Sequence, residues 1–131
     1  MAADLVRASG EFLRLLLVLP RVVGAIPIVE LERRLTSPHV AARAARQRAR
    51  RAPTRSRVAR ERLQRAIAVV DRWMPGGGNC LRRSLLEMSL DAGAAGERLL
   101  AGFKAGGPRA SGHAWLESQP VTERYDAVIR I

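Results

Sequence analysis

Proline and glycine residues divide the hydrophobic pattern of this chain into segments of helical length. The helices that the spacing of apolar residues predicts in the first half cover residues 3–19, 21–35, 38–51 and 55–73. Pro20 and Pro53 separate neighbouring segments, and Ser37 followed by Pro38 suits the N-cap and first position of a helix. Pro75 and three glycines end the last of these helices. The first half of the chain is therefore predicted to be helical.

The pattern changes after residue 75. A helix is predicted to begin at Cys80 and to continue to about Ala92, where Gly93 ends it. The three shorter segments that predict strands cover residues 99–103, 111–117 and 125–131. Together these elements predict an α+β fold, with a helical N-terminal region over residues 1–74 and a core over residues 75–131. In this core the Cys80 helix packs on a three-stranded antiparallel sheet, and we expect both regions to form one compact unit.

Cys80 is the only cysteine, and it follows a glycine-rich approach at the predicted start of a helix. The positive end of the helix dipole would stabilise a thiolate there, which makes Cys80 a candidate nucleophile. The alternative is an inert cysteine that fills space in the core. Asn79 suits the N-cap, and its side chain is a minor candidate for binding an oxyanion in the substrate. The backbone N–H of Cys80 is the better oxyanion donor, because helix N-terminal amides lack intrahelical partners.

His113 lies on the second predicted strand, where it is the candidate base. If the last two strands form a hairpin centred after Gln119, His113 falls directly opposite Asp126, and both side chains project to one face. Glu123 then falls on the other face, so this register selects Asp126 as the carboxylate that orients the imidazole. Trp115 shares the face of His113 and is either a core residue or a cover for the substrate groove.

Three motifs support a resemblance to a known family. They are Asn79-Cys80-Leu81-Arg82-Arg83-Ser84-Leu85, Gly102-Phe103-Lys104 and Gly112-His113-Ala114-Trp115-Leu116-Glu117. Over roughly residues 60–131 the chain resembles the leader-peptidase B protein of lasso-peptide biosynthesis, within the transglutaminase-like cysteine peptidases.

The resemblance implies a papain-like catalytic triad, which would be Cys80, His113 and Asp126. Its implied activity is hydrolysis that removes the leader from a ribosomally made precursor peptide. It also implies a separate leader-recognition protein, since residues 1–74 are not rich in strands, and a macrolactam-forming enzyme downstream. The same triad would serve a transglutaminase-like acyltransferase, and the two reactions are not separated by sequence.

Composition excludes several classes of protein. One cysteine among 131 residues rules out an internal disulfide and suits a reducing, cytoplasmic compartment. His39 and His113 are the only histidines, and no metal-ligand spacing occurs. Gly76-Gly77-Gly78 lacks the Lys-Ser/Thr of a phosphate-binding loop. We therefore expect neither a metal nor a cofactor.

Charge is concentrated in the first half of the chain. Residues 1–74 hold 16 arginines against six acids, a net charge of +10, whereas residues 75–131 hold seven basic residues against six acids. Ten arginines lie between Arg43 and Arg65. They form a solvated helix face, or they dock a partner or an acidic peptide. The second reading leaves a non-catalytic helical adaptor as an alternative function. No aromatic residue lies among them, which argues against nucleic acid.

The N-terminal region contains an apolar stretch at residues 12–29. Charged residues and prolines interrupt it, and its longest uninterrupted run, Leu15–Leu19, is far shorter than the roughly 20 residues that span a bilayer. We expect no transmembrane segment here and no cleaved signal peptide. The prediction is two short helices that pack on the core or on the leader-recognition partner, with a peripheral membrane helix as the alternative.

Overall fold

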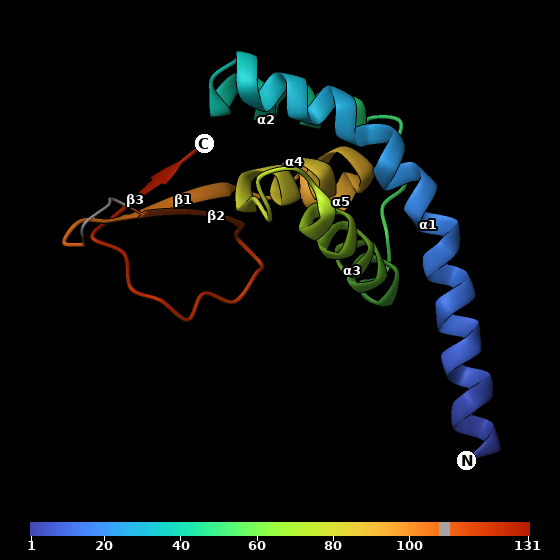
Figure 1. Ribbon diagram of the computed structural model, residues 1–131. Coiled ribbons are helices and arrows are strands. Elements are labelled where there is room, and N and C mark those ends of the chain that lie inside the picture. The colour runs from blue at the N-terminus through green and yellow to red at the C-terminus, as the bar shows by residue number, and fades with distance from the viewer. Residues whose placement is uncertain (108–110) are drawn as a thin grey trace.

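A computed structural model describes residues 1–107 and 111–131 of the protein. Its elements, in chain order, are α1 (Ala2–Leu35), α2 (Pro38–Ala49), α3 (Arg57–Trp73), α4 (Cys80–Leu90), α5 (Ala92–Ala95), β1 (Leu99–Lys104), β2 (Ser111–Leu116) and β3 (Ala127–Arg130) (Figure 1). The predicted α+β fold is confirmed, with a helical N-terminal region followed by a three-stranded antiparallel sheet.

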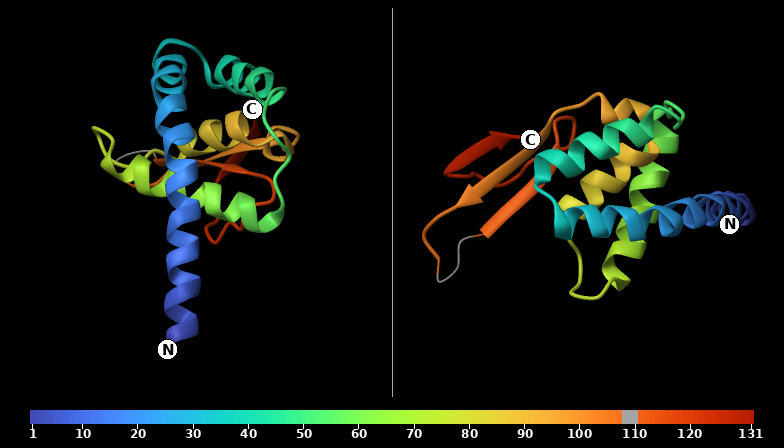
Figure 2. Two further views of the ribbon diagram at one scale, coloured as in Figure 1. Left: turned by 90° about the vertical axis from the view of Figure 1, so that its right-hand side faces the viewer. Right: turned by 90° about the horizontal axis from the view of Figure 1, so that it is seen from above.

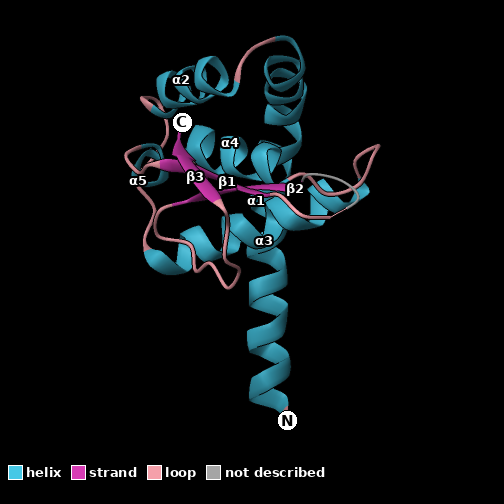
Figure 3. Cartoon of the chain, turned by 90° about the vertical axis from the view of Figure 1, so that its left-hand side faces the viewer, coloured by secondary structure: helices cyan, strands magenta, loops and turns pink. Residues whose placement is uncertain are grey.

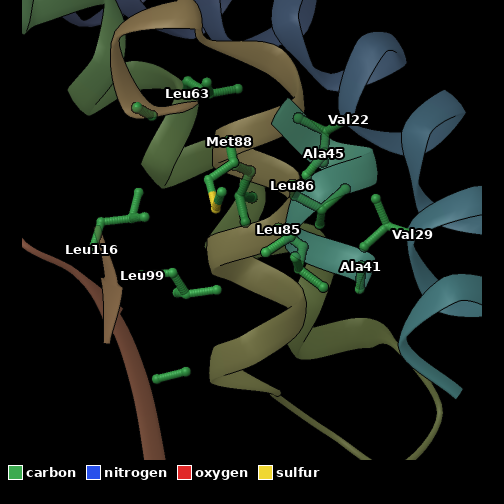
Figure 4. Packing of buried hydrophobic residues seen from close by; sticks show 14 of the residues in the cluster. Val22, Val29, Ala41, Ala45, Leu63, Leu85, Leu86, Met88, Leu99 and Leu116 are labelled. Carbon is green, nitrogen blue, oxygen red and sulfur yellow. The ribbon is translucent and has the colours of Figure 1, made fainter. Parts of the chain in front are cut away.

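Helix α4 lies at the centre of the molecule. Helices α1, α2 and α3 pack around it, and the sheet packs on its remaining side (Figure 2). Figure 4 shows that Leu85, Leu86 and Met88 of α4 meet apolar side chains from the other helices and from the sheet, Leu99 and Leu116 among them. One continuous hydrophobic core therefore holds α4 against both the helices and the sheet.

Polar caps start the helices that the sequence predicts. The hydroxyl oxygen of Ser37 accepts a hydrogen bond from the Val40 amide, and Asn79 caps α4 in the same way. Helices α2, α3 and α4 begin within two residues of their predicted starts. Helix α4 ends at Leu90, two residues early, because the carboxylate of Asp91 accepts from the Gly93 amide and starts α5 there.

The prediction of two short N-terminal helices is wrong, because α1 is one helix that continues through Pro20 and Pro27. A proline removes one backbone hydrogen bond, and both prolines lie on the exposed side of α1, seven residues apart. On the opposite side Val22, Ile26 and Val29 are buried against the other helices. Packing on both sides of the prolines therefore keeps the helix continuous.

The N-terminal part of α1 extends beyond the rest of the molecule as a rod (Figures 1 and 2). Its outer face exposes Phe12, Leu13, Leu16 and Leu17. Residues Arg7–Leu35 are long and apolar enough to cross a membrane by length and composition, a test that signal sequences and core helices also pass. The structure thus shows a longer apolar helix than the interrupted sequence predicts.

The predicted hairpin between the last two strands is also wrong. The strand order is β2-β1-β3, so β1 lies between the two strands expected to pair (Figure 3). His113 pairs with Gly102, and Gly102 pairs on its other side with Val128. The ring of Tyr125 lies against Gly102, where any Cβ would overlap it, and the Asp126 amide donates to the Phe103 carbonyl, so the start of β3 lies beside β1.

Candidate active site

Cys80 is the first residue of α4 and lies beside the outer edge of the sheet. Its Sγ accepts a hydrogen bond from the backbone N–H of Ala114 in β2, at 3.3 Å. The side chain is partly exposed and is a free thiol. Asn79 uses its side-chain oxygen to cap α4 at the amide of Arg82, at 2.9 Å. The helix start thus sets the thiol next to the strand residue that follows His113.

Two buried charged residues fix the start of α4. One carboxylate oxygen of Asp71 in α3 accepts from the Asn79 amide and the other accepts from the guanidinium of Arg82, both at 2.9 Å. Arg82 also donates to Glu30 in α1, at 2.9 Å. A side chain at Gly78 would press on Asp71, since its Cβ would lie 3.2 Å from a carboxylate oxygen. Cys80 is therefore held in place by α1 and α3 together.

Sequence reasoning missed the roles of Asp71, Glu30 and Arg82. Arg82 lies in the first motif, two residues after Cys80, and a buried arginine there requires acidic partners from elsewhere in the chain. Arg33 holds the pKa of Glu30 down, against the opposing effect of burial, and Arg34 and Arg82 add to this, so that the pKa is about 2. Glu30 is thus an anion across the physiological range.

His113 is partly buried on β2, and its ring takes part in an aromatic stack. The ring centroids of His113 and Trp115 are 5.8 Å apart, and Tyr125 stacks on both rings. Trp115 is buried, so it supports the imidazole from the same face of the sheet. Tyr125 was missed by sequence reasoning, although a glycine within a strand, here Gly102, is a known signal of a close approach.

The structure brings Cys80 and His113 to one cavity of about 360 Å³. Its other walls include Gln64, Glu87 and Gln119, and we call it the polar cavity. The amide of Gln119 donates to Glu87 at 2.9 Å, and its oxygen accepts from the backbone of Leu116. The loop after β2 is therefore tied to α4 next to the thiol and the imidazole.

The two carboxylates considered for orienting His113 lie in different surroundings. Asp126 accepts a hydrogen bond from the Ala105 amide at 2.6 Å, and the hairpin register that placed it opposite His113 is wrong. Glu123 lines a second cavity with His113 and forms an ion pair with Lys104 at 2.6 Å. The Lys104 ammonium lowers the pKa of Glu123, and His113 contributes weakly in the same direction.

The arginine-rich stretch is used in part within the fold. Arg48 pairs with Glu32, Arg60 with Glu87 and Glu97, and Arg62 with Glu11. Arg46 and Arg55 donate to backbone carbonyl groups near the end of α4 and in α5. Half of the ten arginines between Arg43 and Arg65 therefore bind other elements of the same chain.

Among residues 1–107 and 111–131, no group of three or more His, Cys, Asp or Glu side chains is placed to hold a metal ion. The chemistry that the described residues offer is that of a thiol and an imidazole beside the N-terminus of a helix. Such a pair suits acyl transfer through a thiolate.

Comparison with known families agrees with this class of site. Residues 25–129 match the model of the transglutaminase-like superfamily, which spans from within α1 to β3. The chain therefore belongs to the transglutaminase-like superfamily, which includes cysteine peptidases and acyltransferases. Neither the curated proteins nor the solved structures contain a match to it.

Proposed function

We propose that the protein is a cysteine peptidase that removes the leader from a ribosomally made precursor of a lasso peptide. The observation that carries the proposal is the meeting of Cys80 and His113 at one cavity, with the thiol at the N-terminus of α4. The superfamily supports thiol chemistry in general. The leader peptide as substrate is supported by the resemblance of the three motifs around Cys80, Gly102 and His113.

In the proposed reaction His113 takes the proton from the thiol of Cys80, and the thiolate attacks the carbonyl carbon of the scissile peptide bond. The resulting oxyanion accepts from the backbone N–H of Cys80, one of the first amides of α4, which have no carbonyl partner within the helix. His113 then returns the proton to the leaving amine. Water, activated by His113, hydrolyses the thioester and restores the thiol.

The third member of the triad is Asp126 in this proposal, on the strength of the resemblance alone. Oδ2 of Asp126 accepts from the Ala105 amide, and Asp126 would have to bring a carboxylate oxygen to His113; catalytic hydrogen bonds often form fully only when substrate is bound. Glu123 shares a cavity with His113 but is largely exposed and already paired with Lys104. Asn79 acts in the proposal as the cap that positions Cys80, and Trp115 as the support for His113.

The nucleophile is tested with Cys80→Ala and His113→Ala, using precursor peptide and mass spectrometry of the products. Both variants should stay folded by circular dichroism, and Cys80→Ala should lose cleavage entirely. Iodoacetamide separates the enzyme from the adaptor alternative. A catalytic Cys80 should be alkylated quickly in the wild type and more slowly in the His113→Ala variant. Cleavage by Cys80→Ala at the wild-type rate would refute the assignment. A product joined to an added amine, in place of free acid, would favour the acyltransferase.

We also propose that a separate leader-recognition protein docks on the exposed apolar face of α1, and that a macrolactam-forming enzyme consumes the released core peptide. A partner that concentrates the leader at the site should raise the cleavage rate tenfold or more. Leu17→Gln should weaken this effect, whereas Arg51→Gln, an exposed change on the arginine-rich stretch, should not. The reverse result, together with a steep loss in high salt, would place the dock on the arginines.

The free thiol of Cys80 suits a reducing, cytoplasmic location, which is part of the proposal. Flotation with lipid vesicles tests the alternative in which α1 binds a membrane, since the protein would then float with the vesicles.

A further inference from the structure

Another cavity, of about 360 Å³ and distinct from the one that Glu123 lines, opens beside Cys80, and its walls are almost wholly apolar. Leu81 of α4, Ala101 and Phe103 of β1, and Ile129 of β3 line it, and Cys80 itself forms part of its wall. We call it the apolar cavity. It shares Cys80, His113 and Ala114 with the polar cavity, which is otherwise lined by residues such as Gln64, Glu87 and Gln119.

The strand pairings show which side chains project to each face of the sheet. Ala101 pairs with Ala114 on one side and with Ile129 on the other, so these three side chains project to one face. Ala114 belongs to the core with α4, which identifies this face as the one toward α4. His113 projects to the opposite face, where it stacks on Trp115 and Tyr125. The thiol, at the edge of β2, lies between the two faces.

This arrangement offers separate binding positions for the two halves of a substrate on either side of the scissile bond. His113 must deliver its proton to the leaving amine, so we place the leaving half in the polar cavity, which His113 lines. The acyl half remains bonded to Sγ of Cys80 and has the apolar cavity beside it. Resting on the function proposed above, we infer that the apolar cavity binds a bulky aliphatic or aromatic side chain on the residue that donates its acyl group to Cys80.

Exposure of the cavity walls supports an apolar occupant. Phe103 and Ile129 are 46% and 45% exposed, next to a partly exposed nucleophile. A side chain that covers them removes apolar surface from water, which favours binding in proportion to the area buried. His39 and His113 also line the cavity, but most of its wall is apolar, and Leu81, Ala101, Phe103 and Ile129 offer no side-chain hydrogen-bond partner. An acidic or amide side chain would therefore lose much of its hydration here.

Alkylation of Cys80 tests the inference without knowledge of the natural precursor. The probes are the chloromethyl ketones of acetyl-leucine, acetyl-alanine and acetyl-aspartate, which place one side chain beside the carbonyl that approaches Sγ. The full chain is treated with each probe, and adduct formation is followed by intact-protein mass spectrometry. Each rate is divided by the rate with iodoacetamide, which carries no side chain. The leucine probe should react about tenfold faster than the alanine probe, and the aspartate probe should be slowest.

Two substitutions on neighbouring residues provide a matched comparison. Ile129→Thr makes the wall of the apolar cavity polar, and it should reduce the leucine-to-alanine ratio severalfold. Val128→Thr is the control, because Val128 is similarly exposed at 52% but pairs with Gly102 on the opposite face. Its ratio should equal that of the wild type. Phe103→Ala should reduce the ratio in the same way as Ile129→Thr.

The outcomes separate this inference from the proposed function. Fast reaction of the wild type with iodoacetamide but equal normalised rates for the three probes would overturn the apolar specificity and leave the nucleophile in place. A faster aspartate probe, or an equal effect of Val128→Thr and Ile129→Thr, would also overturn it. Slow reaction of Cys80 with every reagent would refute the proposed peptidase, and the inference about its acyl donor with it.

Discussion

Asp71→Ala should strongly destabilise the protein, because Asp71 neutralises a buried arginine at the start of α4. Asp71 and Arg82 are 1% and 2% exposed. Among the described residues, removing the carboxylate leaves Glu30 as the one acidic partner of the buried Arg82, beside the Gly77 carbonyl, and it frees the Asn79 amide. Breaking one side of a buried ion pair costs roughly 3–5 kcal/mol. At about 4 °C per kcal/mol for a chain of this length, the melting temperature should fall by about 12–20 °C.

Urea unfolding followed by circular dichroism measures this loss, and Glu61→Ala is the matched control. Glu61 also pairs with an arginine, Arg57, but both side chains are exposed, so its removal should cost less than about 1 kcal/mol. Asp71→Asn retains an acceptor for the Asn79 amide and should fall between the two. A loss for Asp71→Ala no larger than that for Glu61→Ala would show that the buried network does not hold α4.

Three further predictions concern the same framework. The folded-state pKa of Glu30, about 2, lies below its ordinary value of 4.5, so its stabilising contribution is complete above pH 4.5 and is lost as the pH falls toward 2. Glu30→Gln should flatten that part of the curve of unfolding free energy against pH. Gly102→Ala should displace the Tyr125 ring and cost about 1–3 kcal/mol in urea unfolding, whereas Gly24→Ala, with open space around it in α1, should be neutral or stabilising. In precursor cleavage, Asp126→Asn should lower kcat at least tenfold. Glu123→Gln should lower kcat by threefold at most, because Lys104 and solvent already screen Glu123. The opposite order would assign the orienting carboxylate to Glu123.

Local chemistry made much of the fold predictable from the sequence. Ser37 before Pro38, and Asn79 before Cys80, bind amides within three residues of themselves, so the helix starts depend on neighbours that the sequence shows directly. The thiol and the imidazole were found in the same way, from a helix start and from a motif on a strand. The α+β class followed from the lengths and spacing of these segments.

Contacts between distant residues decided the features that were mispredicted. The continuity of α1 through Pro20 depends on burial of its inner face by the other helices, which the interrupted hydropathy does not reveal. The strand order depends on pairing between residues far apart in sequence, such as Gly102 and Val128, with Tyr125 packed over Gly102. The register drawn for His113 and Asp126 assumed that strands consecutive in sequence are neighbours, and here a third strand lies between them.

The burial of Arg82 limits how this protein can be divided. A fragment that begins after α3 would retain Cys80, His113 and the sheet, but it would lack Glu30 and Asp71, the two anions that allow Arg82 to lie inside the molecule. It would also uncover Leu85 and Leu86, which face the other helices in Figure 4. A stable fragment that carries Cys80 and His113 must therefore be supplied with helices α1 and α3, either in the same chain or as a separate piece that reassembles with it.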